Sequence, residues 1–360
     1  MNSLFEIATT AALRWTIGLA VAAGLSACAS RPGAETLIVR QELSKPYQAI
    51  TVITATDRQR DPTGVGYTAA RSSQLQFERF TVAVPTSHKS AGEAQLKMQA
   101  NSPQKYTVIG REQIAVKDIN PDSDTLIYVH GYNYSFQESL FQAAKVAYDG
   151  KLSETPILFS WPSEGSVTGY VADKDAATYA RDDLAKLLRD LKKPRTKSRV
   201  TLFGHSMGAW LVVEALRQLR ISGQDDVLHR IDQVVLAAPD IDIDLFKRQV
   251  ETIGPLARPM IVLNSTDDRA LAVSGRIGGS RARLGSIDKG NAEIQELLIN
   301  KRIEIVNLSD FRSSDKTKHN RFLILVNIIS IYKSGVESSI GRNSSTISTH
   351  ISNDSINSIN

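Results

Sequence analysis

From residue 124 onward, short apolar runs alternate with segments of helical periodicity, and this alternation limits the possible folds more than any other feature of the chain. The run 124–133, DTLIYVHGYN, reads as a buried strand, and 135–150 then spaces apolar residues three and four apart. The pattern predicts further strands at 155–163, 199–203, 231–240, 259–268 and 303–311, and helices at 174–193, 209–220 and 291–298. Apolar strands joined by helices predict an α/β fold with a mostly parallel sheet covered by helices on both faces.

Length and composition fit one large domain with appendages, because 360 residues with 42% hydrophobic content can bury an ample core. We expect a signal peptide at 1–27, a tether at 28–48 and a β-rich extension of the sheet at 49–120. The main α/β domain is expected at 121–325 and a disordered polar tail at 326–360. The formal charge of +5 is scattered along the chain, which does not favour nucleic-acid binding.

Polar residues follow five of the expected strands, and ligands of parallel α/β sheets bind at the carboxyl ends of the strands. Gly131 and Tyr132 follow the first of these strands, and Ser206 follows RVTLF. Acidic residues come after the next two strands, and His319 after the last. A serine, then acids, then a histidine is the chain order of an α/β-hydrolase triad.

Ser206 is the expected nucleophile, because it lies in Gly204-His205-Ser206-Met207-Gly208, where a strand gives way to a helix. A tight turn there lifts the serine side chain clear of the sheet, and the glycines let strand and helix approach closely. The helix that follows adds its N-terminal dipole and the backbone N–H of Met207 as an oxyanion donor. The loop after the earlier strand, at Gly131 or Tyr132, is expected to supply the second donor.

The expected base is His319, since it follows the last clear strand, where a loop can fold back over the serine. His130 is expected to shape the oxyanion loop, and His205 to point away from the site. His88 and His229 have no partner by sequence and are expected to be structural or surface residues, and His350 lies in the tail.

The acid that orients the imidazole is the less certain member of the triad. Asp268 follows the strand after VVLAAP, which is the usual place for it. Asp267, Asp240 and Asp242 stay open as alternatives, because they also follow strand ends. Two of these carboxylates could equally be helix caps or turn residues.

Several segments together resemble a bacterial branch of the α/β-hydrolase superfamily, known as a domain of unknown function or as esterase/lipase-like. They are ITATDR, VAVPTSH, VHGYN, FSWPS, FGHSMGAW, APDID, STDDRAL and KHNRF, and they span roughly residues 50–322. In that pattern an aspartate precedes an Ala-Leu step, as Asp268 does here, and a histidine near the end matches His319. After Phe322 the chain departs from the pattern, where a closing helix is expected.

The N-terminal stretch carries the only cysteine, Cys28, at the end of Leu25-Ser26-Ala27-Cys28. An apolar run at 15–25 precedes it and is too short to span a bilayer. The ending resembles the lipobox of bacterial lipoproteins, which implies acylation of Cys28; an ordinary cleaved signal and an uncleaved anchor are the alternatives. Ala29, by resemblance to enterobacterial lipoproteins, favours the outer membrane, facing the periplasm.

Other chemistries lack their motifs in this sequence. No Cys/His cluster has the spacing of metal ligands, and neither a dinucleotide fingerprint nor a P-loop occurs. Residues 274–283, rich in glycine and arginine, are expected to form a mobile loop; the alternative is that their arginines meet an acidic head group. The sequence therefore predicts a cofactor-free serine hydrolase of small-molecule or lipid esters or thioesters, attached to the membrane through Cys28. The alternatives are an acyltransferase or lipase on envelope lipids, and a non-catalytic envelope lipoprotein with a hydrolase fold.

Overall fold

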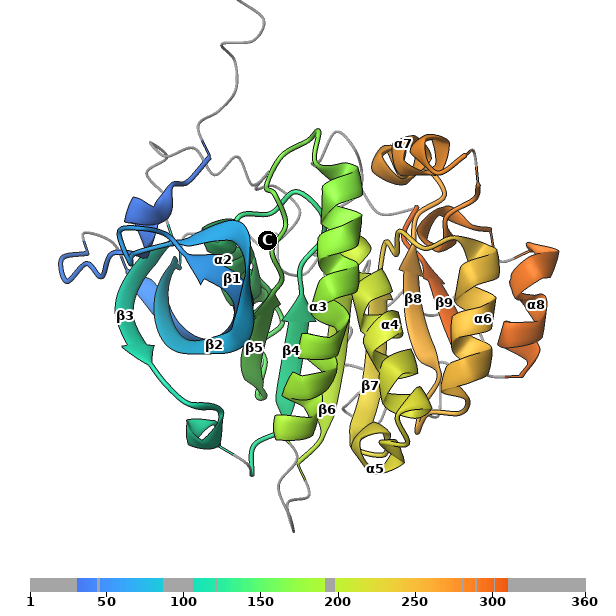
Figure 1. The fold of residues 1–360 in the computed structure, drawn as a ribbon, viewed down its shortest axis with the longest axis horizontal. Helices are drawn as coiled ribbons and strands as arrows, with labels where there is room; N and C mark the ends of the chain where they lie inside the picture. Colours follow the sequence, from blue (N-terminus) through green and yellow to red (C-terminus); the bar gives the residue numbers. More distant parts are fainter. Residues whose placement is uncertain are drawn as a thin grey trace, which may run out of the picture.

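The computed structural model describes residues 31–43, 46–86, 106–120, 122–191, 198–279, 281–288, 290–300 and 302–309. In this part of the chain nine strands form one sheet in the order β3-β2-β1-β5-β4-β6-β7-β8-β9 (Figure 1). The strands are β1 (Tyr47–Arg60), β2 (Tyr67–Pro85), β3 (Thr107–Gln113), β4 (Thr125–Val129), β5 (Thr155–Ser160), β6 (Val200–His205), β7 (Ile231–Ala237), β8 (Met260–Asn264) and β9 (Ile303–Asn307).

Seven neighbouring strands, from β1 through β5, β4, β6, β7 and β8 to β9, run parallel to one another. Only β2 runs against them, paired between β1 and β3. The carboxyl ends of β4, β6, β7 and β8 therefore meet at one edge of the sheet, which we call the carboxyl edge.

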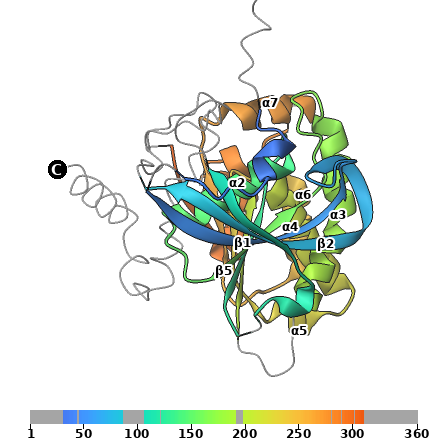
Figure 2. The ribbon, with the colours of Figure 1, turned by 90° about the vertical axis from the view of Figure 1, so that its left-hand side faces the viewer.

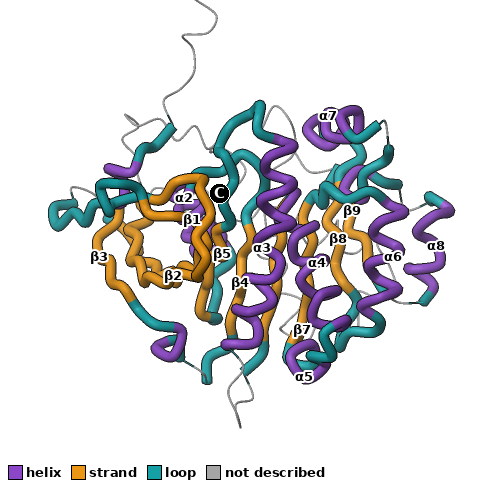
Figure 3. The backbone as a smooth tube through the Cα atoms, in the orientation of Figure 1, coloured by secondary structure: helices purple, strands orange, loops and turns teal. Residues whose placement is uncertain are grey.

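Helices cover both faces of the sheet. The helices are α2 (Phe136–Asp149), α3 (Tyr170–Asp190), α4 (Met207–Ile221), α5 (Asp225–Leu228), α6 (Ile243–Ile253), α7 (Arg269–Ile277) and α8 (Ala292–Ile299), with 3-10 turns η1 (Ala34–Leu37), η2 (Val116–Asp118) and η3 (Leu284–Ser286). Figure 3 shows α3, α4, α6 and α8 in front of the strands, and α2 lies behind them. This arrangement confirms the predicted fold class.

Two buried clusters correspond to the two faces. One gathers the apolar side chains of α3, α4 and α6, and the other those of α2, β2 and η1. The helical stripe expected on 174–193 is buried as predicted, including Ala177, Leu184 and Leu188. Helix α2 starts where its sequence indicates, because Ser135 and Glu138 form a reciprocal capping box.

The N-terminal region differs from the expectation in two ways. Strands β1 and β2 are 14 and 19 residues long, where the sequence indicated short runs. Residues 31–43, expected to belong to a tether, pack on the domain instead: Leu37 is fully buried, and Arg40 N–H donates to Val108 O at 2.9 Å. The sequence did not predict this packing, because a single buried leucine and one backbone hydrogen bond produce no periodic pattern of apolar residues.

Two further segments were not predicted as helices. Helix α6 has a strong apolar face that buries Phe246 and Val250, and α7 runs through the first part of the expected loop at 274–283. The end of that segment, Arg283, is buried as well. The expected tail at 326–360 lies outside the described residues.

Within the described part of the chain, no helix is both long and apolar enough to cross a membrane.

Candidate active site

Ser206 occupies a strained turn between β6 and α4. Its φ of 53° and ψ of −119° lie in a region that side chains other than glycine rarely adopt. The surrounding backbone holds the turn, because Ser206 N–H donates to Ala237 O at 2.8 Å and Ser206 O accepts from Ala209 N at 3.0 Å. The serine is therefore presented at the carboxyl edge by the packing of the fold.

The two flanking glycines are needed for close packing. A Cβ at Gly204 would lie 2.6 Å from Ala209 Cα, and one at Gly208 would lie 2.3 Å from His130 O. Both neighbours belong to elements that cannot easily move, namely the first turn of α4 and the end of β4. The structure thus explains why this pentad combines a serine with glycines on either side.

The loop after β4 lies directly against the serine turn. A Cβ at Gly131 would come within 3.1 Å of Ser206 Cβ and 2.9 Å of His205 Nδ1. Met207 is the first residue of α4, where a backbone N–H has no acceptor inside its own helix. The structure therefore brings together Ser206, Met207 and the Gly131–Tyr132 loop, three of the elements that the sequence singled out.

Asp173, a residue that sequence reasoning missed, holds this loop from α3. It is fully buried, and its Oδ2 accepts from Asn133 N–H at 3.0 Å and from Ser163 Oγ at 2.6 Å. Its Oδ1 accepts from Glu164 N–H at 2.6 Å. Asn133 has a φ of 64°, so the carboxylate stabilises a left-handed turn next to Tyr132. The signal in the sequence was a charged residue in register with the apolar stripe of α3.

Arg58 supports the same loops from β1. Its buried guanidinium donates to Tyr134 O at 2.8 Å and to Ser163 O at 3.0 Å. Burial lowers the pKa of this guanidinium to about 10, and the nearby charge of Asp57 opposes that shift. Arg58 stays charged near neutral pH and joins the strand hairpin at 47–85 to the edge where Ser206 lies.

His130 is a structural residue, as the sequence indicated. Its ring stacks on Trp161 at 4.9 Å between centroids, and Trp161 Nε1 donates to His130 O at 2.8 Å. Complete burial, with a smaller contribution from the charge of Arg58, lowers the pKa of this imidazole to about 3. His130 is therefore neutral at physiological pH and shapes the loop that contains Gly131.

Asp268 lies after β8, at the N-cap of α7. The side chain is buried, and its Oδ1 accepts from Ala270 N–H at 2.9 Å and Leu271 N–H at 3.0 Å. These bonds fix the carboxylate beside the carboxyl edge. Its neighbour Asp267 is half-buried and accepts from Ser265 Oγ at 2.7 Å.

Asp240 is engaged in a different cluster. Its Oδ1 accepts from Ser274 Oγ at 2.8 Å and lies 3.3 Å from Arg283 Nε, and its Oδ2 accepts from Tyr170 OH at 2.8 Å. Arg283 is almost completely buried, so the pair forms an internal ion pair that the sequence did not predict. Asp242, the fourth candidate, caps α6 through Leu245 N–H.

Of the remaining predicted residues, one is on the surface, one is in the interior and the others lie outside the described part of the chain. His205 is buried with its ring edge-on to Tyr134, at 6.5 Å between centroids, and His229 is exposed after α5. His319, His88, His350 and Cys28 lie outside the described residues. Among the residues that are described, no group of three or more His, Cys, Asp or Glu could hold a metal ion.

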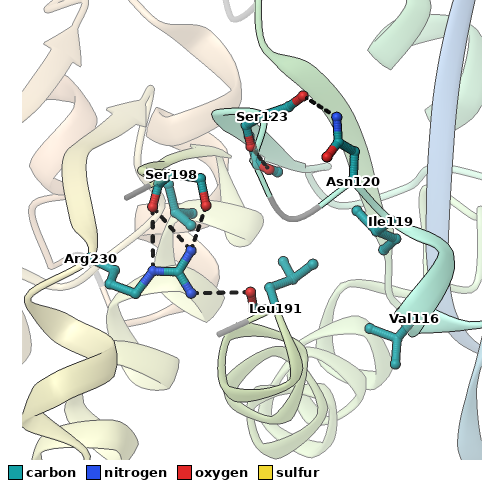
Figure 4. Close-up of a pocket in the computed structure, with 9 residues that line it drawn as sticks. Val116, Ile119, Asn120, Ser123, Leu191, Ser198 and Arg230 are labelled. Carbon is teal, nitrogen blue, oxygen red and sulfur yellow. Dashed lines mark hydrogen bonds between the residues drawn. The ribbon is translucent and has the colours of Figure 1, made fainter. Parts of the chain in front are cut away.

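A small pocket lies at the opposite edge of the sheet. Figure 4 shows Arg230 there, donating to Leu191 O at 3.1 Å and to Ser198 Oγ at 2.8 Å. Its volume of about 10 Å³ has room for roughly one water molecule. A larger cleft of about 530 Å³, between the end of α6 and Arg302, also lies away from Ser206. Ser206 therefore lines neither cavity.

The strand order and the strained serine turn define a protein of the α/β-hydrolase class. The chain belongs to the family described as alpha/beta hydrolase of unknown function (DUF900), which matches residues 111–334. The resemblance noted in the sequence is thereby confirmed.

Individual relatives are distant. The uncharacterized protein alr1448 of Nostoc sp. (strain PCC 7120) is 34% identical over 61 residues, which is 17% of this chain and only 16% of that protein. The esterase domain of a Rhodothermus marinus protein is 11% identical with a TM-score of 0.33, covering 79% of this chain and 97% of that one. Est1E from Butyrivibrio proteoclasticus is 11% identical with a TM-score of 0.35, covering 72% and 95%.

Proposed function

We propose that the protein is a serine hydrolase of carboxylic esters or thioesters. The observation that carries this proposal is the left-handed backbone of Ser206 at the junction of β6 and α4. A residue is held in such a conformation only when the surrounding structure over-determines it, and nucleophiles of this class occupy such turns.

In the proposed reaction Ser206 Oγ attacks the acyl carbon while His319 accepts the hydroxyl proton. The oxygen of the tetrahedral intermediate accepts hydrogen bonds from the N–H of Met207 and from the loop at Gly131 or Tyr132. Collapse of the intermediate breaks the ester or thioester bond, and His319 donates the proton to the departing alcohol or thiol. Water, deprotonated by His319, then attacks the acyl-serine and releases the acid.

Asp268 is the proposed partner of His319. Its cap on α7 holds the carboxylate in place through Oδ1, beside the carboxyl edge where Ser206 lies. Asp240 suits this role less well, because its carboxylate is already paired with the buried guanidinium of Arg283.

The nucleophile is tested with a fluorophosphonate probe on the full chain. Wild-type protein should become labelled and Ser206→Ala should not, because alanine keeps the fold but removes the attacking oxygen. Ser222→Ala is the matched control, since Ser222 is an exposed serine at the other end of α4 and should leave labelling unchanged. Equal labelling of wild type and Ser206→Ala, or none in folded wild type, would instead favour a non-catalytic binding protein.

The proton-transfer residues are tested by turnover of p-nitrophenyl esters of increasing acyl length. His319→Ala and Asp268→Asn should each lower kcat by orders of magnitude, about 10⁴-fold for a triad aspartate. Both variants should keep their secondary structure by circular dichroism. Wild-type turnover in either variant would remove that residue from the mechanism, and transfer to an added alcohol in preference to water would identify an acyltransferase.

We also propose that Cys28 is acylated and anchors the protein in the bacterial envelope, in the outer membrane facing the periplasm. The support is the Leu25-Ser26-Ala27-Cys28 ending and the residue after it, Ala29. Labelled palmitate should enter the wild-type chain in cells and not Cys28→Ala. Incorporation that persists in the variant would show that lipid is attached elsewhere.

A further inference from the structure

The first described residue, Arg31, is bound to the loops of the candidate active site. Its guanidinium contacts Glu138 at 2.6 and 2.8 Å, Asn133 Oδ1 at 2.8 Å and Asn133 O at 2.5 Å, and it also donates to Gly165 O. Asn133 directly follows Tyr132, so the chain enters the domain beside the loop of the second oxyanion donor. In Figures 1 and 2 the start of the described chain (blue) and α7 (orange) both lie on the upper side of the molecule.

The residues after Arg31 hold this entry point in place. Pro32 is buried, and its carbonyl accepts from Gln137 Nε2 at 2.5 Å. Leu37 is fully buried against α2 and β2. Cys28 precedes Arg31 by three residues, and three residues of any conformation reach at most about 11 Å. A lipid on Cys28 would therefore be attached close to the loop that contains Gly131.

The same edge exposes apolar side chains on two segments around the site. Val167, between β5 and α3, is 77% exposed, and Val171, in the first turn of α3, is 67% exposed; on α7, Val273 and Ile277 are 53% and 55% exposed. Both segments touch candidate catalytic elements, because Val167 O accepts from Tyr132 OH and Asp268 caps α7. Large apolar side chains exposed together around a site indicate a surface that becomes covered.

The charged residues of α7 indicate which partner would cover this apolar surface. Arg269 and Arg276 are exposed at the two ends of α7, and Arg281 follows the helix. Arg281 lies 3.7 Å from the carboxylates of Asp242 and Asp244, which compensate its charge. For Arg269 and Arg276, the described part of the chain shows no ion pair with a carboxylate, and both side chains are exposed to solvent. Exposed apolar residues interleaved with arginines match the boundary of a bilayer that contains anionic phospholipids.

We propose that Val167, Val171, Val273 and Ile277, with Arg269 and Arg276, form a membrane-docking surface for a phospholipid bilayer. The short link from Cys28 to Arg31 holds this surface against the membrane in which the lipid anchor lies. Ser206 then faces the bilayer, and the substrates are acyl esters of amphiphiles that enter from it. This inference rests on the proposed hydrolase and its lipid anchor.

Orientation is tested without catalysis, in the Ser206→Ala background. The full chain with Val171→Cys or Ile299→Cys is labelled with bimane and reconstituted into vesicles of phosphatidylethanolamine and phosphatidylglycerol with nitroxide-bearing acyl chains. Ile299 is the matched control, because it is 74% exposed but lies on α8, beside β9 at the far end of the sheet. Cys28 is the only native cysteine, and its acylated sulfur does not react with the label.

Bimane at position 171 should be quenched at least threefold more strongly than bimane at position 299. Equal quenching at the two positions, or a chain that does not float with the vesicles, would overturn the proposal. Because neither readout needs turnover, an inactive wild-type enzyme would refute the hydrolase and leave the orientation to be decided by quenching.

The substrate class is tested with Val171→Asp, which the first turn of α3 accommodates because an acid there favours the helix dipole. Hydrolysis of a fluorogenic diacyl ester in vesicles should fall more than tenfold, while hydrolysis of soluble p-nitrophenyl butyrate stays within twofold of wild type. Ile299→Asp should change neither rate. Equal effects of the two variants on the vesicle substrate would refute the membrane-docking surface.

Discussion

Replacing Asp57 by asparagine should change how the stability of the protein depends on pH. Asp57 is fully buried in β1, and neither carboxylate oxygen has a hydrogen-bond partner among the described residues. It lies where the pairing of β1 with β2 shifts register, between Thr56 and Arg58. Burial, helped by the negative charge of Asp183, raises the pKa of Asp57 from 3.8 to about 7; Arg58 and Arg71 oppose the shift.

The sign of the effect follows from the two pKa values. Between about pH 4 and pH 7 the unfolded chain releases the Asp57 proton and the folded chain keeps it. The free energy of unfolding therefore falls with rising pH across this window. Three pKa units correspond to up to about 4 kcal/mol, lost in full above pH 7. Asparagine has nearly the same shape and does not titrate, so Asp57→Asn should escape this loss.

The measurement is urea unfolding followed by circular dichroism at half-unit steps from pH 4.5 to 8.5. Wild type and Asp57→Asn should differ little at pH 4.5 and by up to about 4 kcal/mol at pH 8.5, with the variant more stable. The control is Asp61→Asn, in the turn after β1. Thr63 donates a hydrogen bond to this carboxylate and lowers its pKa, so the ionised form stabilises the folded chain. Asp61→Asn should therefore lower the free energy of unfolding at high pH relative to wild type. Parallel curves for wild type and Asp57→Asn would show that Asp57 is ionised throughout, which would refute the reasoning.

Three further substitutions have defined outcomes. Gly208→Ala should cost about 3 kcal/mol in urea unfolding and lower kcat, because its Cβ would lie 2.3 Å from His130 O; wild-type stability would contradict this packing. Asp173→Asn should lose about 2 kcal/mol and, by steady-state kinetics, lower kcat more than it changes KM, since one backbone N–H loses its acceptor. Asp240→Asn should cost about 3 kcal/mol by leaving the buried Arg283 unpaired, while kcat per folded molecule stays within about threefold; a loss of kcat without a loss of stability would instead favour Asp240 as the triad acid.

The sequence by itself determined the layered architecture and the position of the serine turn at Ser206. Periodicity is a property of the local backbone, because side chains alternate along a strand and return every three or four residues in a helix. The buried stripe on α3 and the serine turn after β6 could therefore be predicted without knowing what they pack against. Asp268 was expected at the end of a strand, and its side chain lies buried there; its role as the triad acid stays a prediction.

Only the tertiary structure decided which distant residues hold the site together. Asp173 meets Asn133 across 40 positions of the chain, and Arg31 meets Asn133 across 102. Such contacts depend on strand order and on the rotation of each helix against the sheet, which local sequence patterns do not encode. In the sequence, a carboxylate or guanidinium that will be buried looks like any other charged residue. Only the folded chain shows which groups compensate its charge. It also shows that the Asp57 carboxylate has no hydrogen-bond partner among the described residues.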